Sequence, residues 1–374
     1  MGAGDELAIQ GAELIRWMEM FASPKLAVEN DRIGLQVGSI HAEVEGVLVT
    51  LDVTEKVVDE AIKQGVNWII GHHAIIYQPM KQICTDSPAG RLLQKCLKHD
   101  IQVYIAHTNL DAAEEGVNTV LAEKLGLQGC RTLVHHKQDR LKKLVVFVPE
   151  SHVDEVEHAL GEAGAGEIGN YSHCSFQTAG TGTFLPHSGT KPYIGEPGIL
   201  ERVAEVRLET ILPESKQKMI LSAMHKAHPY EEIAYDLYIL DSPGSPVGMG
   251  KIGTLPERMT LQAFIDLVKS AYHIPHLRFV GDSNRIIEKV ALLGGAGSRY
   301  MRDAVWQGAD VYLTGDIDFH TAQDALTEGI ALVDPGHHIE YVSMQRVVDR
   351  LQDAFGSRIT IQLSQIDTNP FSFQ

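Results

Sequence analysis

Short apolar runs alternate with amphipathic segments in the first third of the chain. Three apolar runs bounded by polar or glycine residues are typical of buried strands: 46–52, 66–71 and 101–107. The segments after them have apolar residues at helical spacing: 54–65, with Thr54 as its expected N-cap, 89–100 and 114–126. Strands separated by helices predict a parallel or mixed sheet covered on both faces.

The last third repeats this pattern. Strands are expected at 288–297, 309–316 and 329–336, with helices at 298–308 and 337–355. The two regions also align without gaps at one offset, which lays His73 over Asp316. Either two strand-helix units share generic patterning, or the chain contains an internal duplication with two similar halves facing each other.

Residues 140–245 differ in character from the flanking regions. They predict two successive strand-helix-strand units, with the glycine-rich stretch 178–198 in the middle, which is the order of a ferredoxin-like domain. The expected fold is therefore α/β. Two similar α/β halves pack face to face in one discontinuous domain, 1–139 plus 246–374, and residues 140–245 form an inserted ferredoxin-like α+β domain.

Charge narrows the range of partners. The 374 residues include 32 Lys and Arg against 49 Asp and Glu, a formal net charge of −17, and no basic cluster stands out. Nucleic acid and anionic membrane surfaces are therefore disfavoured partners.

The four cysteines form no CxxC pair, and neither a membrane-length apolar run nor a signal-peptide pattern is present, so a cytoplasmic location is expected.

Ligand-type side chains follow the ends of three predicted strands. They are His72 and His73, His107 and Asp111, and the group Asp334, His337, His338 and Glu340. In open α/β sheets, binding sites form at the carboxyl ends of strands. We therefore expect these distant segments to meet at one edge.

Imidazole together with carboxylate suits zinc, manganese or iron. Neighbouring residues on a strand point to opposite sides, so His72 and His73 are expected at the strand end, each serving a different metal of a close pair. Glu340 or Asp111 could bridge two ions about 3.5–4 Å apart, as in two-metal hydrolases. A single histidine is more often a surface or hydrogen-bonded residue. The prediction therefore depends on two HH pairs combined with His337 and Glu340 three residues apart at a helix start.

Other polar groups have two interpretations each. His107 and Thr108 could orient ligands or be structural, and Asp52 could lie beside the site. His320 could be a general acid or base, or a capping or packing residue, and Asp316 could hold His320 or a water.

Three further features each have a functional and a plain structural interpretation. The turn 294–298 could cradle a phosphate, although a tight turn is favoured. The group around His225 and His228 could be a third metal site, although a strand edge is favoured. His135 and His136 lie in a polar stretch without a carboxylate motif and are expected to be exposed.

Several segments together resemble a known family. They are DRIGLQVG (31–38), LDVT (51–54), GHH (71–73), AHTNLD (106–111), TGD (314–316) with His320, and DPGHHIE (334–340). Over nearly the whole chain, they are similar to the Nif-three-like family, whose members are often described as GTP cyclohydrolase I type 2 homologues.

The resemblance implies a dinuclear metal site made by His72, His73, Asp111, His337 and Glu340. It also implies a homohexameric, ring-like or cage-like assembly, and an insertion that resembles the PII/CutA signalling fold around 228–238. Family members often place the glutamate four residues after the histidine, whereas the gap from His337 is three. His337 or His338 could therefore be the ligand, and His337 is favoured because it follows Gly336.

The function expected first is that of a metal-dependent hydrolase with two divalent ions per chain, zinc before manganese or iron, acting on a nucleotide or related small molecule. The alternative is a non-catalytic metal-binding scaffold or regulator that uses the insertion for ligand sensing or oligomer contacts. A nucleic-acid-associated factor is a weaker interpretation, because the net charge of −17 opposes it. The expected partner is the protein itself in a homo-oligomer.

Overall fold

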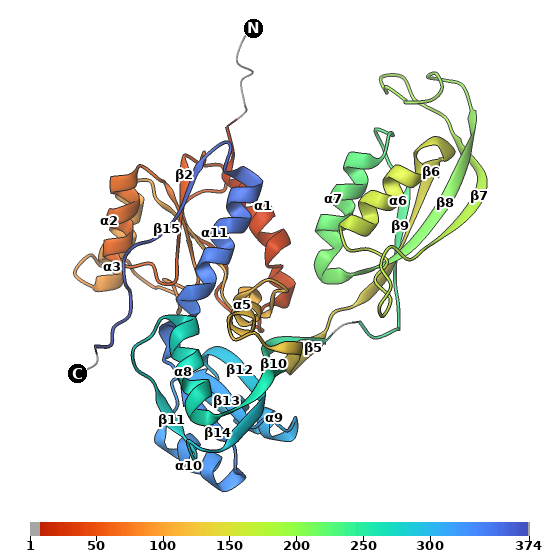
Figure 1. Ribbon diagram of the computed structural model, residues 1–374. Helices are drawn as coiled ribbons and strands as arrows, with labels where there is room; N and C mark the ends of the chain where they lie inside the picture. The colour runs from red at the N-terminus through yellow and green to blue at the C-terminus, as the bar shows by residue number, and fades with distance from the viewer. Residues whose placement is uncertain (1–7, 245, 373–374) are drawn as a thin grey trace. The chain divides into compact units, whose positions relative to one another are not determined.

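The computed structural model describes residues 8–244 and 246–372, which form two compact units. Unit 1 combines Met1–His136 with Val247–Gln374, and unit 2 is Lys137–Pro246. Figure 1 shows that unit 1 is built from segments at both ends of the chain.

The first sheet of unit 1 has five strands. Its order is β1 (Gly34–Val37), β4 (Gln102–Ile105), β3 (Trp68–Gly71), β2 (Gly46–Thr50) and β15 (Thr360–Leu363). The last four of these strands run parallel, and β1 pairs antiparallel with β4. Every residue of β2, β3 and β4 is buried, which explains why these strands are continuous apolar runs in the sequence.

The second sheet of unit 1 has six strands. Its order is β11 (Arg278–Val280), β14 (Ala331–Asp334), β13 (Val311–Gly315), β12 (Ile286–Ala296), β10 (Pro246–Thr260) and β5 (Gln128–Gln138). Strands β12, β13 and β14 are parallel, and β10 and β11 pair antiparallel with their neighbours. The prediction of a mixed α/β fold with helix-covered sheets is confirmed.

Both sheets turn one face toward the same layer of helices. This layer contains α1 (Gly11–Phe21), α5 (Val117–Lys124), α8 (Leu261–Tyr272) and α11 (Tyr341–Phe355). Val49 of the first sheet, Leu292 of the second and Phe264 of α8 belong to one continuous apolar cluster. The two sheets are therefore joined through a single core, which fixes how their strand ends meet.

The outer faces of the sheets are covered by separate helices. The first sheet carries α2 (Glu55–Gln64) and α3 (Pro88–Lys98), and the second carries α9 (Met301–Trp306) and α10 (Phe319–Glu328). Helix α2 begins where the Thr54 side chain accepts a hydrogen bond from the amide of Val57, as predicted, and it ends at Gly65 in the left-handed conformation.

Unit 2 has one four-stranded antiparallel sheet, in the order β7 (Ser175–Phe184), β8 (Glu201–Pro213), β6 (Leu141–Pro149) and β9 (Tyr235–Ile239). Helices α6 (Val153–Glu162) and α7 (Gln217–Ala227) cover one face, where Leu144, Leu208 and Ile220 share an apolar cluster. The glycine-rich stretch begins as strand β7 and continues into the loop before β8.

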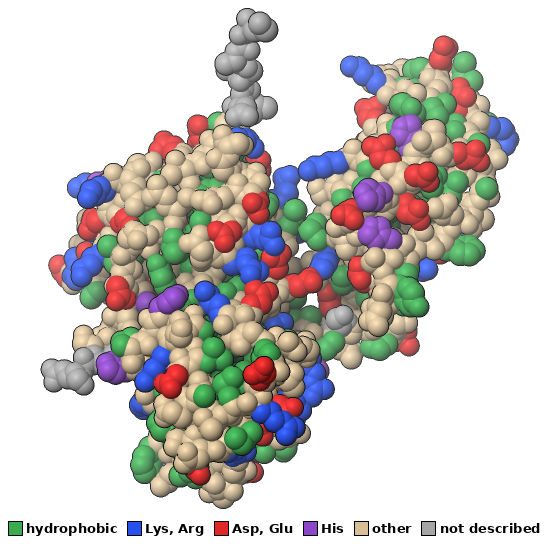
Figure 2. Space-filling model, in the orientation of Figure 1, with side chains coloured by type: hydrophobic (Ala, Val, Ile, Leu, Met, Phe, Trp, Pro, Cys, Tyr) green, Lys and Arg blue, Asp and Glu red, His purple; other side chains and the backbone are tan. Residues whose placement is uncertain are grey.

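The remaining short elements are the helix α4 (Thr108–Ala112) and five 3₁₀ turns: Pro24–Leu26, Glu150–His152, Glu214–Lys216, Ser298–Tyr300 and η5 (His337–Glu340). Within residues 8–244 and 246–372, no helix is both long and apolar enough to span a bilayer. On the face drawn in Figure 2, basic side chains are interspersed with acidic ones.

The shared core makes a specific stability prediction. Phe264 is fully buried between the sheets, whereas Phe319 on α10 is 71 % exposed. We expect Phe264→Ala to lower the free energy of unfolding by about 3–5 kcal/mol, because it leaves a cavity. Phe319→Ala should change it by no more than about 0.5 kcal/mol. Urea unfolding followed by circular dichroism measures both, and equal losses would contradict a core shared by the two sheets.

Candidate metal centre

His72 and His73 lie where β3 stops pairing and the chain turns. The amide of His73 donates to the carbonyl of Leu51 at 3.0 Å, and that of His72 donates to the same carbonyl at 3.1 Å. Both histidines are therefore anchored to the end of β2, one strand away. This turn sends the two rings into the same region, with their centroids 5.0 Å apart.

The His72 ring is fully buried, and a hydrogen bond to the backbone determines which of its two nitrogens carries the proton. Its Nδ1 donates to the carbonyl of Ala106 at 2.8 Å, so Nε2 carries the lone pair of the neutral ring. Burial lowers the pKa of His72 to about 3, which keeps the ring neutral. Its Nε2 faces Asp111 Oδ1 at 3.6 Å and Glu340 Oε2 at 3.9 Å.

Two of these three facing atoms, His72 Nε2 and Asp111 Oδ1, are buried without a hydrogen-bond partner among the described residues. The third, Glu340 Oε2, is equally buried and also faces His73 and His337. Burial, reinforced by the charge of Glu340, raises the pKa of Asp111 well above its usual value. The His72 lone pair converges with two carboxyl oxygens in a buried site, and a divalent cation would satisfy this set of ligands.

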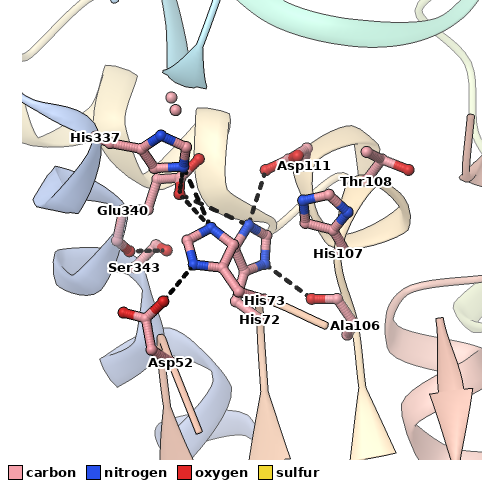
Figure 3. A network of polar contacts seen from close by, with 12 residues as sticks. Asp52, His72, His73, Ala106, His107, Thr108, Asp111, His337, Glu340 and Ser343 are labelled. Atoms are coloured by element: carbon pink, nitrogen blue, oxygen red, sulfur yellow. Dashed lines mark hydrogen bonds and ion pairs between the residues drawn. The ribbon is translucent and has the colours of Figure 1, made fainter. Parts of the chain in front are cut away.

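A second group shares Glu340 with the first. His73 Nδ1 donates to Asp52 Oδ1 at 2.7 Å (Figure 3). His337 Nδ1 donates to Asp316 Oδ2 at the same distance, 2.7 Å. The Nε2 atoms of the two histidines lie 3.3 Å apart, and contact Glu340 Oε2 at 3.2 and 3.3 Å. Two imidazole nitrogens and a carboxylate oxygen so arranged could bind one metal ion, with the aspartates orienting the rings.

His107 extends the cluster on another side. Its Nδ1 donates to Asp31 Oδ1 at 2.9 Å, and its ring centroid lies 5.1 Å from that of His72. Burial opposes ionisation of Asp31, but hydrogen bonds from His107 and Thr108 outweigh it and hold the pKa of Asp31 well below its usual value. His107, His72 and His73 have ligand atoms close enough to form a third potential metal-binding group.

The prediction that His337 and Glu340 lie at the start of an α-helix is wrong. Both lie on the 3₁₀ turn η5, which precedes α11. A 3₁₀ turn has three residues per turn, so residues at i and i+3 line up directly. A three-residue gap therefore suffices to aim both side chains at one point. His338 turns elsewhere: its Nε2 lies 3.3 Å from Thr368 Oγ1, and its ring stacks on Tyr341.

The glycines at the end of β12 and β13 form a wall of the cluster. Gly295 has a φ of +68°, and a Cβ atom there would lie 2.6 Å from Glu340 Oε1 and 3.2 Å from His337 Nε2. Gly315 is equally confined, because a Cβ would lie 2.8 Å from the His337 amide nitrogen. The turn 294–298 thus packs against the ligand-type side chains.

Other predicted candidates lie outside these groups. His320 is exposed on α10, where its amide donates to the capping Asp318, and Asp316 contacts His337 instead of His320. His228 is satisfied by backbone: one ring nitrogen donates to the Phe147 carbonyl and the other accepts from the Tyr230 amide. His135 and His136 are exposed, as predicted.

Sequence reasoning missed four features. Asp31 as the partner of His107, Gly295 as a wall and Asp316 as the partner of His337 depend on contacts between segments distant in sequence. The position of Asp31 inside the DRIGLQVG segment was the available signal. An exposed group on unit 2, His158, Glu162 and His173, was also missed, but it lacks the burial that distinguishes the main cluster.

Comparison with known proteins identifies the family of the chain. Residues 9–370 match the family Duf34/NIF3 (NGG1p interacting factor 3). The chain belongs to the Duf34/NIF3 family. A Bacillus subtilis (strain 168) relative named GTP cyclohydrolase 1 type 2 homolog is 48 % identical over 98 % of this chain and 99 % of its own length. The resemblance drawn from the motifs is therefore confirmed.

Solved structures extend the comparison to the fold. A Bacillus cereus protein related to NIF3 is 48 % identical, with a TM-score of 0.82 over 99 % of this chain and all of that one. A Staphylococcus aureus protein is 32 % identical, with a TM-score of 0.70 over 98 % of this chain and 99 % of that one. The whole Duf34/NIF3 chain, including unit 2, is thus shared with these relatives.

The wall glycine gives a matched test of the cluster. Gly295→Ala and Gly65→Ala impose similar backbone strain, because their φ angles are +68° and +70°, but nothing lies within 4 Å of a Cβ at Gly65. We expect both variants to lose roughly 1 kcal/mol of stability. Only Gly295→Ala should lose bound metal, measured by elemental analysis. Equal metal content in the two variants would contradict the role of Gly295.

The ring environments predict a pH dependence of metal binding. Without metal, the contact with Glu340 raises the pKa of His337 to about 9. Burial opposes protonation of His73, but contacts with Asp52 and Glu340 outweigh it and raise its pKa to about 10. Both rings are then protonated near neutral pH, and a metal must displace those protons.

We therefore expect the association constant for Zn²⁺ to fall as the pH falls, by up to about tenfold per pH unit for each proton displaced. Competition with a chelator between about pH 6 and pH 8 measures this slope. A flat profile would mean that His73 and His337 do not bind the metal.

Proposed function

We propose that the protein is a metal-dependent hydrolase that holds two divalent ions in the His and carboxylate cluster. The observation that supports this most directly is the convergence of three buried atoms: His72 Nε2 and Asp111 Oδ1, which have no hydrogen-bond partner among the described residues, and Glu340 Oε2. The second group, His73, His337 and Glu340, shares one carboxylate with the first. A carboxylate common to two ligand groups supports a bridged pair of ions.

Zinc is the favoured ion, since histidine nitrogen and carboxylate oxygen are its usual ligands, with manganese or iron as alternatives. When bound, such ions supply Lewis-acid activation of water and substrate for hydrolysis. The protein's own part is to keep the rings in the binding tautomer, through Asp52, Asp316 and the Ala106 carbonyl.

Unequal burial indicates where a substrate would approach. The side chains of His72 and Glu340 are 0 % and 3 % exposed, whereas those of His73 and His337 are 26 % and 35 % exposed. Water and substrate therefore reach the cluster from the side of His73 and His337. His320 remains a proposed general acid or base only if substrate binding brings it there.

The substrate that we propose is a nucleotide or related small molecule, which rests on the name GTP cyclohydrolase 1 type 2 homolog carried by relatives. We also propose a homohexamer located in the cytoplasm.

The arrangement of strands supports two further proposals. The parallel strands β2, β3 and β4 and the parallel strands β12, β13 and β14 support two similar halves. The order β-α-β-β-α-β of unit 2 supports a ferredoxin-like, PII/CutA-like insertion at residues 140–245.

A non-catalytic role is the second candidate. It is favoured by one observation, a cavity of about 630 Å³ confined to unit 2, which would suit a regulatory protein that senses a small ligand. Turnover distinguishes the two candidates.

Metal content tests the dinuclear site. We expect about two ions per chain in the wild type and about one in Asp111→Ala or His337→Ala, each of which removes a ligand from one group. Glu340→Ala should lose both ions, because both groups share it. His338→Ala is the matched control and should keep both, since its ring lies against Thr368 and Tyr341. Full occupancy in Glu340→Ala would refute the site.

Turnover tests the hydrolase itself. The metal-loaded wild type and His73→Ala are compared on a panel of nucleotides and phosphoesters, with the oligomer mass checked for both. Hydrolysis by the wild type that is lost in His73→Ala, with an unchanged assembly, is the expected result. Full metal occupancy without turnover would favour the scaffold.

A further inference from the structure

Unit 2 has a cavity of about 630 Å³, open to solvent, on the face of its sheet that α6 and α7 do not cover. Its floor is formed by β7 and β8, and its rim by the loop segment 185–194 and residues 230–234. Ligand pockets for small molecules are typically about 300–1,000 Å³ and largely apolar. All of its lining residues belong to unit 2.

Two glycines, Gly180 and Gly182, shape the floor of the cavity. Gly180 has nothing but the Glu205 carbonyl, at 3.9 Å, within reach of an added Cβ. At Gly182, by contrast, a Cβ would lie 1.9 Å from Glu205 Oε2, so this glycine makes room for the carboxylate. Glycine inside a strand often marks a place where a ligand approaches the backbone closely.

The Glu205 carboxylate is built into this cavity. The residue is only 7 % exposed, and its Oε1 accepts a hydrogen bond from the Tyr230 hydroxyl at 2.9 Å. Tyr230 is held in turn by His228, whose Nδ1 accepts from the Tyr230 amide at 3.1 Å. Oε2, over Gly182, is the oxygen left for another donor.

Aromatic rings line the same cavity as the carboxylate. The Tyr230 ring lies 6.0 Å from that of Phe184 and 6.4 Å from that of Tyr193, and Phe147 also lines the cavity. Aromatic faces beside a carboxylate are the environment that binds cationic nitrogen, by cation–π attraction and charge pairing.

The charges of the lining favour a cation over an anion. Three carboxylates line the cavity, those of Glu205, Glu231 and Glu232, against one guanidinium, that of Arg207. Arg207 is already paired with Glu209 at 3.1 Å. A phosphate or carboxylate ligand would face net repulsion here, whereas an amine would be attracted.

We propose that this cavity binds a small amine with an aromatic or apolar body, with its cationic nitrogen at Glu205 and its body among the rings of Phe147, Phe184 and Tyr230. The site is independent of the proposed hydrolase, since it shares no residue with the His and carboxylate cluster. Either proposal can therefore fail alone.

Tryptamine and indole-3-propionate, which carry opposite charges on the same ring system, test the chemistry. Titration calorimetry on the full chain should give saturable binding of one tryptamine per chain, at least tenfold tighter than indole-3-propionate. Glu205→Gln keeps an acceptor for Tyr230 but removes the charge, and should weaken tryptamine binding at least tenfold. Equal affinity for the two probes, or unchanged binding in Glu205→Gln, overturns the proposal.

A steric variant tests the location. Gly180→Leu would project a side chain into the cavity without a backbone clash, and should abolish tryptamine binding. Gln177→Leu is the control, because it lies exposed on the same strand outside the cavity lining. Both should keep the wild-type metal content. Equal binding in the two variants overturns the proposal. The proposal is also overturned if the wild type binds no tryptamine and Gly180→Leu changes the oligomer mass. That result would mean that a second copy of the chain fills the cavity.

Discussion

The burial of the Glu340 carboxylate is the constraint on which the rest of unit 1 depends. An ionised carboxylate removed from water is costly unless charge or hydrogen bonds replace its hydration. Glu340 is 2 % exposed, and it meets His73 from the first sheet and His337 from the turn after the second. Neither sheet could satisfy Glu340 alone, so the packing of the two sheets and the chemistry of the cluster depend on each other.

The apolar core provides the rigidity that this arrangement needs. Helices α1, α5, α8 and α11 share one apolar cluster with residues of both sheets, so the strand ends are held by packing before any ligand binds. The aspartates add a second restraint, because each holds the Nδ1 of one histidine and leaves the Nε2 directed inward. Such a site is preorganised, and little side-chain entropy remains to be lost when an ion enters.

Much of this could be predicted from the sequence, for a definite reason. The runs that form β3, before His72, and β14, before His337, are continuous and apolar, so their type and ends were clear. Ligand-type residues directly after them pointed to one edge of the fold. The 3₁₀ turn at His337 and Glu340 was not predicted, because a sequence spacing of three fits both kinds of helix. The roles of Asp31, Asp316 and Gly295 were also hidden, since they arise only when distant segments pack.

The order of the ligands along the chain has a consequence for biosynthesis. His73 and His337 are 264 residues apart, and all of unit 2 is encoded between them. At about 5–20 residues per second, a ribosome needs roughly 15–50 seconds to travel from the first histidine to the second. Helix α11 and strand β15, the edge strand of the first sheet, are synthesised only after His337. The cluster around Glu340 can therefore form only when nearly the whole chain has been made.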